Sequence, residues 1–115
     1  RMVDTSGTIQ TVAGNGLFGF GGDGGPATSA ELFMPQGVSV DKSGNIYIAD
    51  TSNTRVRQVN SSGTIVTLAG TGLQGYNGDH LPAIQTNLYP VTVIANPNGA
   101  VLVMDNDGFR VRRIK

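Results

Sequence analysis

The chain repeats itself once, and this internal repeat constrains the possible folds more than any other feature of the sequence. Val12–Leu17 recurs as Leu68–Leu73, 56 residues later. After one deletion the offset falls to 55, and Arg55–Arg57 recurs as Arg110–Arg112. The 115 residues therefore hold two structural units, with a short overlap at the two ends. Units of this length in tandem are typical of β-propellers, in which each unit packs against its neighbours.

Each unit is expected to form four short β-strands. In the first unit, runs rich in β-branched residues lie between turn residues, and these runs are Ile9–Ala13, Gln36–Val40, Ile46–Ala49 and Arg55–Val59. Such runs predict strands. Helical periodicity is confined to one or two turns at Ala27–Phe33 and at the matching segment Ala83–Tyr89, within long loops. Four antiparallel strands in a repeat of this length indicate an all-β fold made of β-propeller blades.

The composition argues against several classes of function. Lys and Arg together number 8, as do Asp and Glu, and the formal net charge of zero argues against an electrostatic grip on nucleic acid or on an anionic membrane. The chain has no cysteine, and His80 is its one histidine, so one chain cannot build a zinc site from several histidines or cysteines. We therefore assign no catalytic residue, no metal and no cofactor.

One segment of the first unit carries a recognisable motif. Gly44–Asn53, followed by Arg55–Arg57, resembles the core signature of NHL repeats. The segment from Ala13 to Val38 is similar to the long linker found in the bacterial branch of that family. The likeness covers the whole chain, although the second unit departs from the pattern where Gly108 replaces Asn53. The resemblance implies a six-bladed propeller that serves as a binding or scaffolding module, with an extracellular or periplasmic location.

Two blades cannot close a propeller, so we expect the chain to assemble with itself. The units are residues 1–57 and 58–115, and each holds an outer strand, a long linker and three further strands. The outer strand of the second unit completes the first blade, whereas the second blade lacks an outer strand and the strand at Thr8–Ala13 lacks a blade. Open sheet edges and bare apolar faces favour pairing with another chain. Exchange of outer strands between copies predicts a homotrimer with six blades, closed head to tail.

The linkers carry the first candidate ligand-binding residues. Phe20 and Tyr76 each lie in a glycine-rich turn, and the carboxylates of Asp23 and Asp79 follow three residues later. In the functional interpretation the rings stack on a ligand, and the carboxylates accept hydrogen bonds from a sugar or a peptide. In the structural alternative the rings fix the loop to the blade, while the carboxylates cap the short helix or accept backbone N–H groups.

Asp50 and Asp105 complete the candidate ligand-binding set, because both close a predicted strand on the same loop face. In a functional interpretation they surround a central cation. In a structural interpretation they accept N–H groups of the turn and pair with Arg55 or Arg110 across the hairpin.

The combined interpretation is a non-enzymatic binding or scaffold module. It would bind a protein, a peptide or a small ligand on the loop face, with no membrane partner. Two alternatives remain open. One is a calcium- or zinc-dependent enzyme that resembles propeller lactonases or lyases. The other is an NHL domain that binds single-stranded RNA through its repeated arginines on the last strand of each unit.

Overall fold

The computed structural model describes all 115 residues, which form short strands and 3₁₀ turns. Along the chain the elements are β1 (Met2–Val3), β2 (Ile9–Gln10), η1 (Ala27–Ser29), β3 (Gly37–Val40), β4 (Ile46–Asp50), η2 (Thr51–Asn53), β5 (Arg55–Val59), β6 (Ile65–Ala69), η3 (Ala83–Gln85), β7 (Pro90–Ala95), β8 (Val101–Asp105) and β9 (Arg110–Ile114). Every pair of neighbouring strands is antiparallel, which confirms the all-β class. No helix has the length and apolar character needed to cross a membrane.

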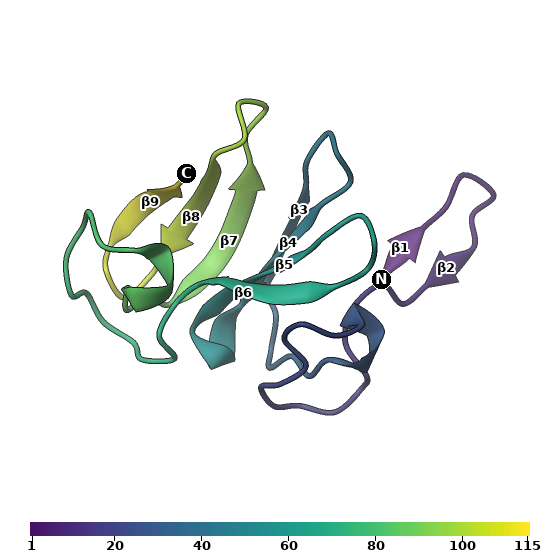
Figure 1. Ribbon diagram of the computed structural model, residues 1–115, viewed down its shortest axis with the longest axis horizontal. Helices are drawn as coiled ribbons and strands as arrows, with labels where there is room; N and C mark the ends of the chain where they lie inside the picture. The colour runs from purple at the N-terminus through teal and green to yellow at the C-terminus, as the bar shows by residue number, and fades with distance from the viewer.

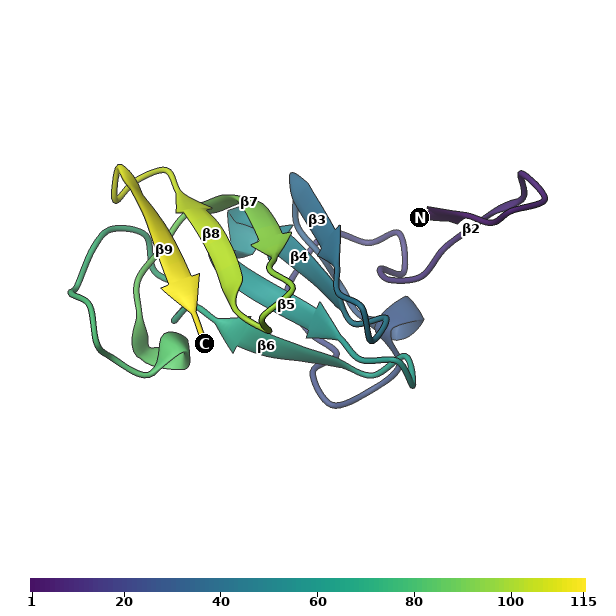
Figure 2. The same ribbon diagram turned by 90° about the horizontal axis from the view of Figure 1, so that it is seen from above.

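Two sheets and a separate hairpin make up the fold (Figure 1). The first blade has the strand order β3-β4-β5-β6, and the second blade has the order β7-β8-β9. The two blades lie side by side, and the β1–β2 hairpin extends from the end of the first blade, away from the second (Figure 2). The free edge of the second blade is β9. The strand that completes the first blade, β6, comes from the second sequence repeat.

Short turns held by side chains join the strands of each blade. The Asp41 carboxylate accepts hydrogen bonds from the backbone N–H groups of Ser43 and Asn45, each at 2.9 Å. The side-chain amide of Asn45 donates to the same carboxylate and is the main reason why the pKa of Asp41 lies below its usual value. Asn60 closes the β5–β6 turn in the same way. Gly44 has a φ of +83°, a conformation that glycine adopts without steric cost.

The structure shortens two of the expected elements. The predicted strand Ile9–Ala13 is reduced to β2, because the two residues of β1 are all that lies opposite it. The predicted helical segment Ala27–Phe33 is reduced to the single turn η1, because Ala30 has extended backbone angles and ends the turn. The matching segment in the second unit shortens in the same way, to η3.

The main core lies between the two blades. Side chains alternate along β4, so that Tyr47 and Ala49 face the second blade and Ile48 faces the opposite side. The interblade cluster consists of Tyr47, Ala49, Val56, Ala69, Leu88, Val93, Val101 and Val103. A second cluster forms around Ile48, from Ala27, Ala30, Val59 and Ile65. This second cluster attaches η1 and β6 to the rest of the first blade.

Gly70 follows β6, where the chain leaves the first blade, and has a φ of +102°. A Cβ atom added at Gly70 would collide with the backbone of Thr54 and Arg55. Gly63 has a similar φ of +83°, but a Cβ atom added there would meet no other atom. We expect Gly63→Ala to lower the free energy of unfolding by about 1–2 kcal/mol through backbone strain. Gly70→Ala should lower it by at least about 1 kcal/mol more, because overpacking is added. Urea unfolding at fixed protein concentration measures both, and equal losses would contradict the close approach at Gly70.

Candidate functional site

A fully buried arginine organises the loop face of the first blade. The Arg57 side chain is 0% exposed, and its guanidinium pairs with Asp23 at 2.8 Å and with Asp50 at 3.1 Å. It also donates hydrogen bonds to two backbone carbonyls of the first linker (residues 14–34). Arg57 lies on β5 and Asp50 ends β4, so one side chain joins two strands and the linker. The planar guanidinium suits this role, because its five N–H groups point in fixed directions.

Asp50 is also fully buried, and three donors of this chain bind its carboxylate. Besides Arg57, it accepts the backbone N–H of Phe33 and the side-chain amide of Asn53, both at 2.8 Å. Burial of a carboxylate is tolerated when an opposite charge and hydrogen bonds compensate it. The pair between Arg57 and Asp50 is therefore one unit, in which the loss of either partner leaves a buried charge alone.

Phe20 packs against two arginines. The guanidinium carbon of Arg55 lies 3.8 Å from the centre of the Phe20 ring, and that of Arg57 lies 4.9 Å from it. At these distances a cation is attracted to the face of an aromatic ring. Next to the ring, the Gly19 carbonyl accepts a hydrogen bond from Asn53 at 2.7 Å. The glycine-rich turn is thereby fixed to the blade, with Phe20 remaining 44% exposed.

The second unit repeats this arrangement around Arg112. The Arg112 guanidinium pairs with Asp79 at 3.0 Å and with Asp105 at 3.5 Å, and the guanidinium carbon of Arg110 lies 3.8 Å from the centre of the Tyr76 ring. The pair with Asp105 is longer than the equivalent pair in the first unit, and the Arg112 side chain is 12% exposed. The second cluster is therefore looser than the first.

The outer strand marks a second difference between the two clusters. Thr67 of β6 donates its hydroxyl to Asp23 at 2.6 Å, so that the Asp23 carboxylate is bound from two sides. Asp79 has no strand beside it and accepts instead the hydroxyl of Tyr76 at 3.0 Å. This hydrogen bond is the main cause that holds the pKa of Asp79 below its usual value, and the positive charge of Arg112 acts in the same direction. The side chain of Asp79 is 52% exposed, compared with 37% for Asp23.

The six residues predicted from the sequence fall into these two clusters, three in each: Phe20, Asp23 and Asp50 in the first, and Tyr76, Asp79 and Asp105 in the second. Their contacts are to arginines and backbone groups of this chain, and ligand binding by them stays a prediction.

The arginine partners expected for the two buried carboxylates are wrong. Asp50 pairs with Arg57 instead of Arg55, and Asp105 pairs with Arg112 instead of Arg110. The guanidinium of Arg57 reaches Asp50 and the linker at once, whereas that of Arg55 lies over an aromatic ring. The central role of Arg57 is not apparent from spacing alone. One sequence signal could have indicated it: both units carry an arginine at the same position of a short run rich in β-branched residues. A charge in such a buried strand needs a fixed partner of opposite charge.

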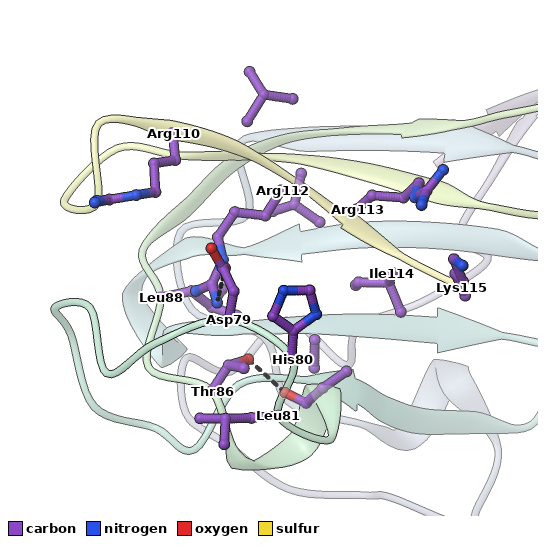
Figure 3. Close-up of a pocket in the computed structure, with 14 residues that line it drawn as sticks. Asp79, His80, Leu81, Thr86, Leu88, Arg110, Arg112, Arg113, Ile114 and Lys115 are labelled. Carbon is purple, nitrogen blue, oxygen red and sulfur yellow. Dashed lines mark hydrogen bonds and ion pairs between the residues drawn. The ribbon is translucent and has the colours of Figure 1, made fainter.

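A groove of about 700 Å³ lies beside the second cluster, between β9 and the second linker (residues 70–89) (Figure 3). Asp79 and His80 line it on the linker side, and Arg112 and Ile114 line it along β9. Among the six predicted residues, Asp79 is the one that lines this groove. The structure contains no group of three or more His, Asp or Glu side chains placed to hold a metal ion.

Residues 19–83, more than half of the chain, match the sequence model of the teneurin NHL domain. The chain belongs to this family. Teneurin-3 of Danio rerio is 36% identical over 94 residues and Teneurin-4 of Mus musculus is 39% identical over 93 residues, and each match covers 75% of this chain and 3% of the relative. Protein SUPPRESSOR OF QUENCHING 1, chloroplastic, of Arabidopsis thaliana is 30% identical over 99 residues, covering 85% of this chain and 9% of that protein. The chain thus spans a small part of each relative.

Two solved structures from Bacteroides thetaiotaomicron VPI-5482 share the fold. A structural genomics protein of unknown function superposes with a TM-score of 0.66 at 24% identity, over 76% of this chain and 22% of the other. An auxiliary nutrient binding protein superposes with a TM-score of 0.69 at 21% identity, over 90% of this chain and 28% of the other. At this identity the similarity describes the fold, and together with the family match it confirms blades of an NHL propeller.

Removal of the buried guanidinium tests the first cluster. We expect Arg57→Met to lower the free energy of unfolding by about 3–5 kcal/mol, because Asp50 would be left as an uncompensated buried charge. Lys42→Met, at an exposed cation in the turn between β3 and β4, is the control and should change stability by less than about 0.5 kcal/mol. Urea unfolding at one protein concentration compares the two. Similar losses would show that the Arg57 pairs contribute little to the fold.

Tyr76→Phe removes the hydroxyl that binds Asp79 and keeps the ring beneath Arg110. We expect the pKa of Asp79 to rise toward its usual value, because the hydroxyl stabilises the ionised carboxylate. Because the pKa of Asp79 is lower in the folded state than in the unfolded state, this carboxylate stabilises the fold at pH values above its unfolded-state pKa. That contribution is lost as the pH falls through the folded pKa, so Tyr76→Phe should weaken the acid dependence of stability. Carboxyl ¹³C NMR titration measures the shift, with Asp41 as the internal control. An unchanged Asp79 pKa would contradict the hydrogen bond.

Proposed function

We propose that this NHL segment is a non-enzymatic binding and scaffold module, and that three copies assemble head to tail into a closed ring of six blades. The observation that carries the proposal is the match between the interface inside the chain and the two faces left open on either side of the blade pair. Large exposed apolar faces on a soluble domain mark interaction surfaces.

The inner interface buries a valine from each blade. Val93 on β7 is 2% exposed and Val56 on β5 is 0% exposed, because each lies in the interblade cluster. Their counterparts in the other repeat unit are Val38 on β3, which is 67% exposed, and Val111 on β9, which is 68% exposed. Each open face therefore exposes a valine whose counterpart is buried in the inner interface.

The two open faces are also complementary to each other. Val38 belongs to the face by which a blade contacts the preceding blade, and Val111 belongs to the face by which it contacts the next. Met104, which is 48% exposed, takes the place of the buried Ala49 on that second face. A second copy placed beyond the second blade would repeat the inner interface. Such a heterologous contact forms a ring when the rotation closes, and the six blades typical of NHL propellers would require three copies.

The loop face is the proposed place for a protein, a peptide or a small ligand. Phe20 and Tyr76 occupy equivalent positions there and are 44% and 42% exposed, so a ring would present them repeatedly on one face. The engagement of Asp50 and Asp105 by buried or nearly buried arginines supports a structural rather than a catalytic role for these carboxylates. The proposal includes an extracellular or periplasmic location, in keeping with the NHL resemblance.

Light scattering on a sizing column tests the assembly. We expect the 11.9 kDa chain to run as a species of about 36 kDa, the mass of three copies. Val38→Lys and Val111→Lys should each give a species of about 12 kDa, because each places a charge in the interface between copies.

Leu17→Lys is the matched control. Leu17 is 65% exposed, and its counterpart Leu73 is 64% exposed although it lies beside the inner interface, so this position is not covered when blades pack. The control variant should assemble like the wild-type chain. A monomeric wild-type chain at micromolar concentration would overturn the proposal, and so would a trimer that tolerates both valine substitutions.

A further inference from the structure

We infer that the groove beside β9 is the seat of an outer strand supplied by a second copy of the chain, and that residues 7–13 of that copy fill it. The inference rests on the proposed assembly. It specifies the segment that one copy inserts into the next and the contacts that hold it.

The first blade shows the seat when it is occupied. Ile65 of β6 is 0% exposed and packs among four side chains contributed by the linker, β4 and β5: Ala27, Ala30, Ile48 and Val59. β6 itself pairs with β5 along its length. One isoleucine thus anchors the outer strand to the blade.

Polar contacts hold β6 on its other edge. The backbone N–H of Gly24 donates to the Ile65 carbonyl at 2.7 Å, and the Ile65 N–H donates to the Gly25 carbonyl at 3.1 Å. The Thr67 hydroxyl donates to the Asp23 carboxylate at 2.6 Å. The outer strand is therefore bound between β5 and the first linker.

The groove of the second blade has the same lining without the strand. The counterparts of the four residues around Ile65 all line it, and these are Ala83, Thr86, Val103 and Ile114. Asp79, the counterpart of Asp23, also lines it and has an exposed carboxylate. Figure 3 shows Asp79 and Thr86 on the linker side and Ile114 on β9. The groove thus offers an apolar site for one side chain and an acceptor for a hydroxyl.

The matching strand lies at the opposite end of the chain. Ile9 is the counterpart of Ile65 and Thr11 is the counterpart of Thr67, 56 residues earlier in both cases. Ile9 is 50% exposed. The β1–β2 hairpin and β9 lie at opposite ends of the molecule, so the occupant comes from a second copy (Figure 1). When seated, Ile9 would enter the apolar site and Thr11 would donate its hydroxyl to Asp79.

Seating requires β2 to exchange partners. Arg1–Val3 corresponds to Arg112–Ile114 in the repeat. The strand β1 of the incoming copy and the strand β9 of the receiving copy would therefore pair with the same edge of β2, and only one of them can do so at a time. The hairpin now joins β1 and β2 through two residue pairs, whereas β5 and β6 are joined through four. Replacement of β1 by β9 would therefore lengthen the ladder and bury Ile9.

A disulfide that locks β1 onto β2 tests this exchange. The chain has no cysteine, and Met2 lies opposite Gln10, so Met2→Cys/Gln10→Cys can form a single bond. We expect the oxidised variant to stay monomeric where the wild-type chain and the reduced variant form trimers. Gln58→Cys/Val66→Cys is the matched control, because these two residues are the equivalent pair of β5 and β6, which never need to separate. Equal assembly of the oxidised and reduced Met2→Cys/Gln10→Cys variants would overturn the exchange and leave the ring intact.

A peptide experiment tests the binding of the strand in the groove separately from the assembly of the ring. A synthetic peptide with the sequence of residues 5–14 is added to the oxidised Met2→Cys/Gln10→Cys variant, and the amide NMR signals of Asp79 and Ile114 are followed. We expect saturable shifts, and an affinity at least about tenfold lower for the Ile9→Lys peptide, since a charge would enter the apolar site. If the wild-type chain is monomeric and the peptide still binds, the groove is confirmed as the binding site of the strand and the trimeric ring is ruled out. If both peptides or an unrelated strand-forming peptide bind equally, or none binds, the proposed seat falls.

Discussion

The guanidinium group of Arg57 connects parts of the chain that lie far apart in the sequence. It bridges the end of β4, the middle of β5 and a linker that has little regular structure of its own. A buried positive charge would be very costly alone, but two carboxylates and two backbone carbonyls surround it. The Arg57 guanidinium consequently holds the linker against the blade, and the positions of Phe20 and Asp23 depend on this contact.

The two blades differ both at the outer strand and in the ionic cluster. In the first blade β6 packs against the linker, and the Thr67 hydroxyl donates a hydrogen bond to the Asp23 carboxylate. In the second blade no strand occupies that place, and the equivalent pair between Arg112 and Asp105 is longer. The Thr67 hydroxyl thus links the outer strand of the first blade directly to its ionic cluster.

Much of the fold follows from local sequence signals. The constant offset between the units, together with turns such as Asp41–Asn45, places β3, β4 and β5 close to their observed bounds, because side-chain alternation and turn chemistry are local properties. The length of β2 is set by how many residues lie opposite it, which only the folded chain reveals. The repeat also explains why the six candidate residues gather in two equal clusters. The choice of Arg57 over Arg55 as the partner of Asp50 depends on which arginine lies beneath the linker, and the sequence carries no direct record of that arrangement.

The first blade takes its last strand from the following repeat, so the boundaries of sequence and of structure are out of phase by one strand. During synthesis, a blade can be completed only after the start of the next repeat has emerged from the ribosome. Gene duplication is affected as well. Insertion or loss of a whole unit therefore changes the number of blades by one and leaves the strand pairing inside the other blades unchanged.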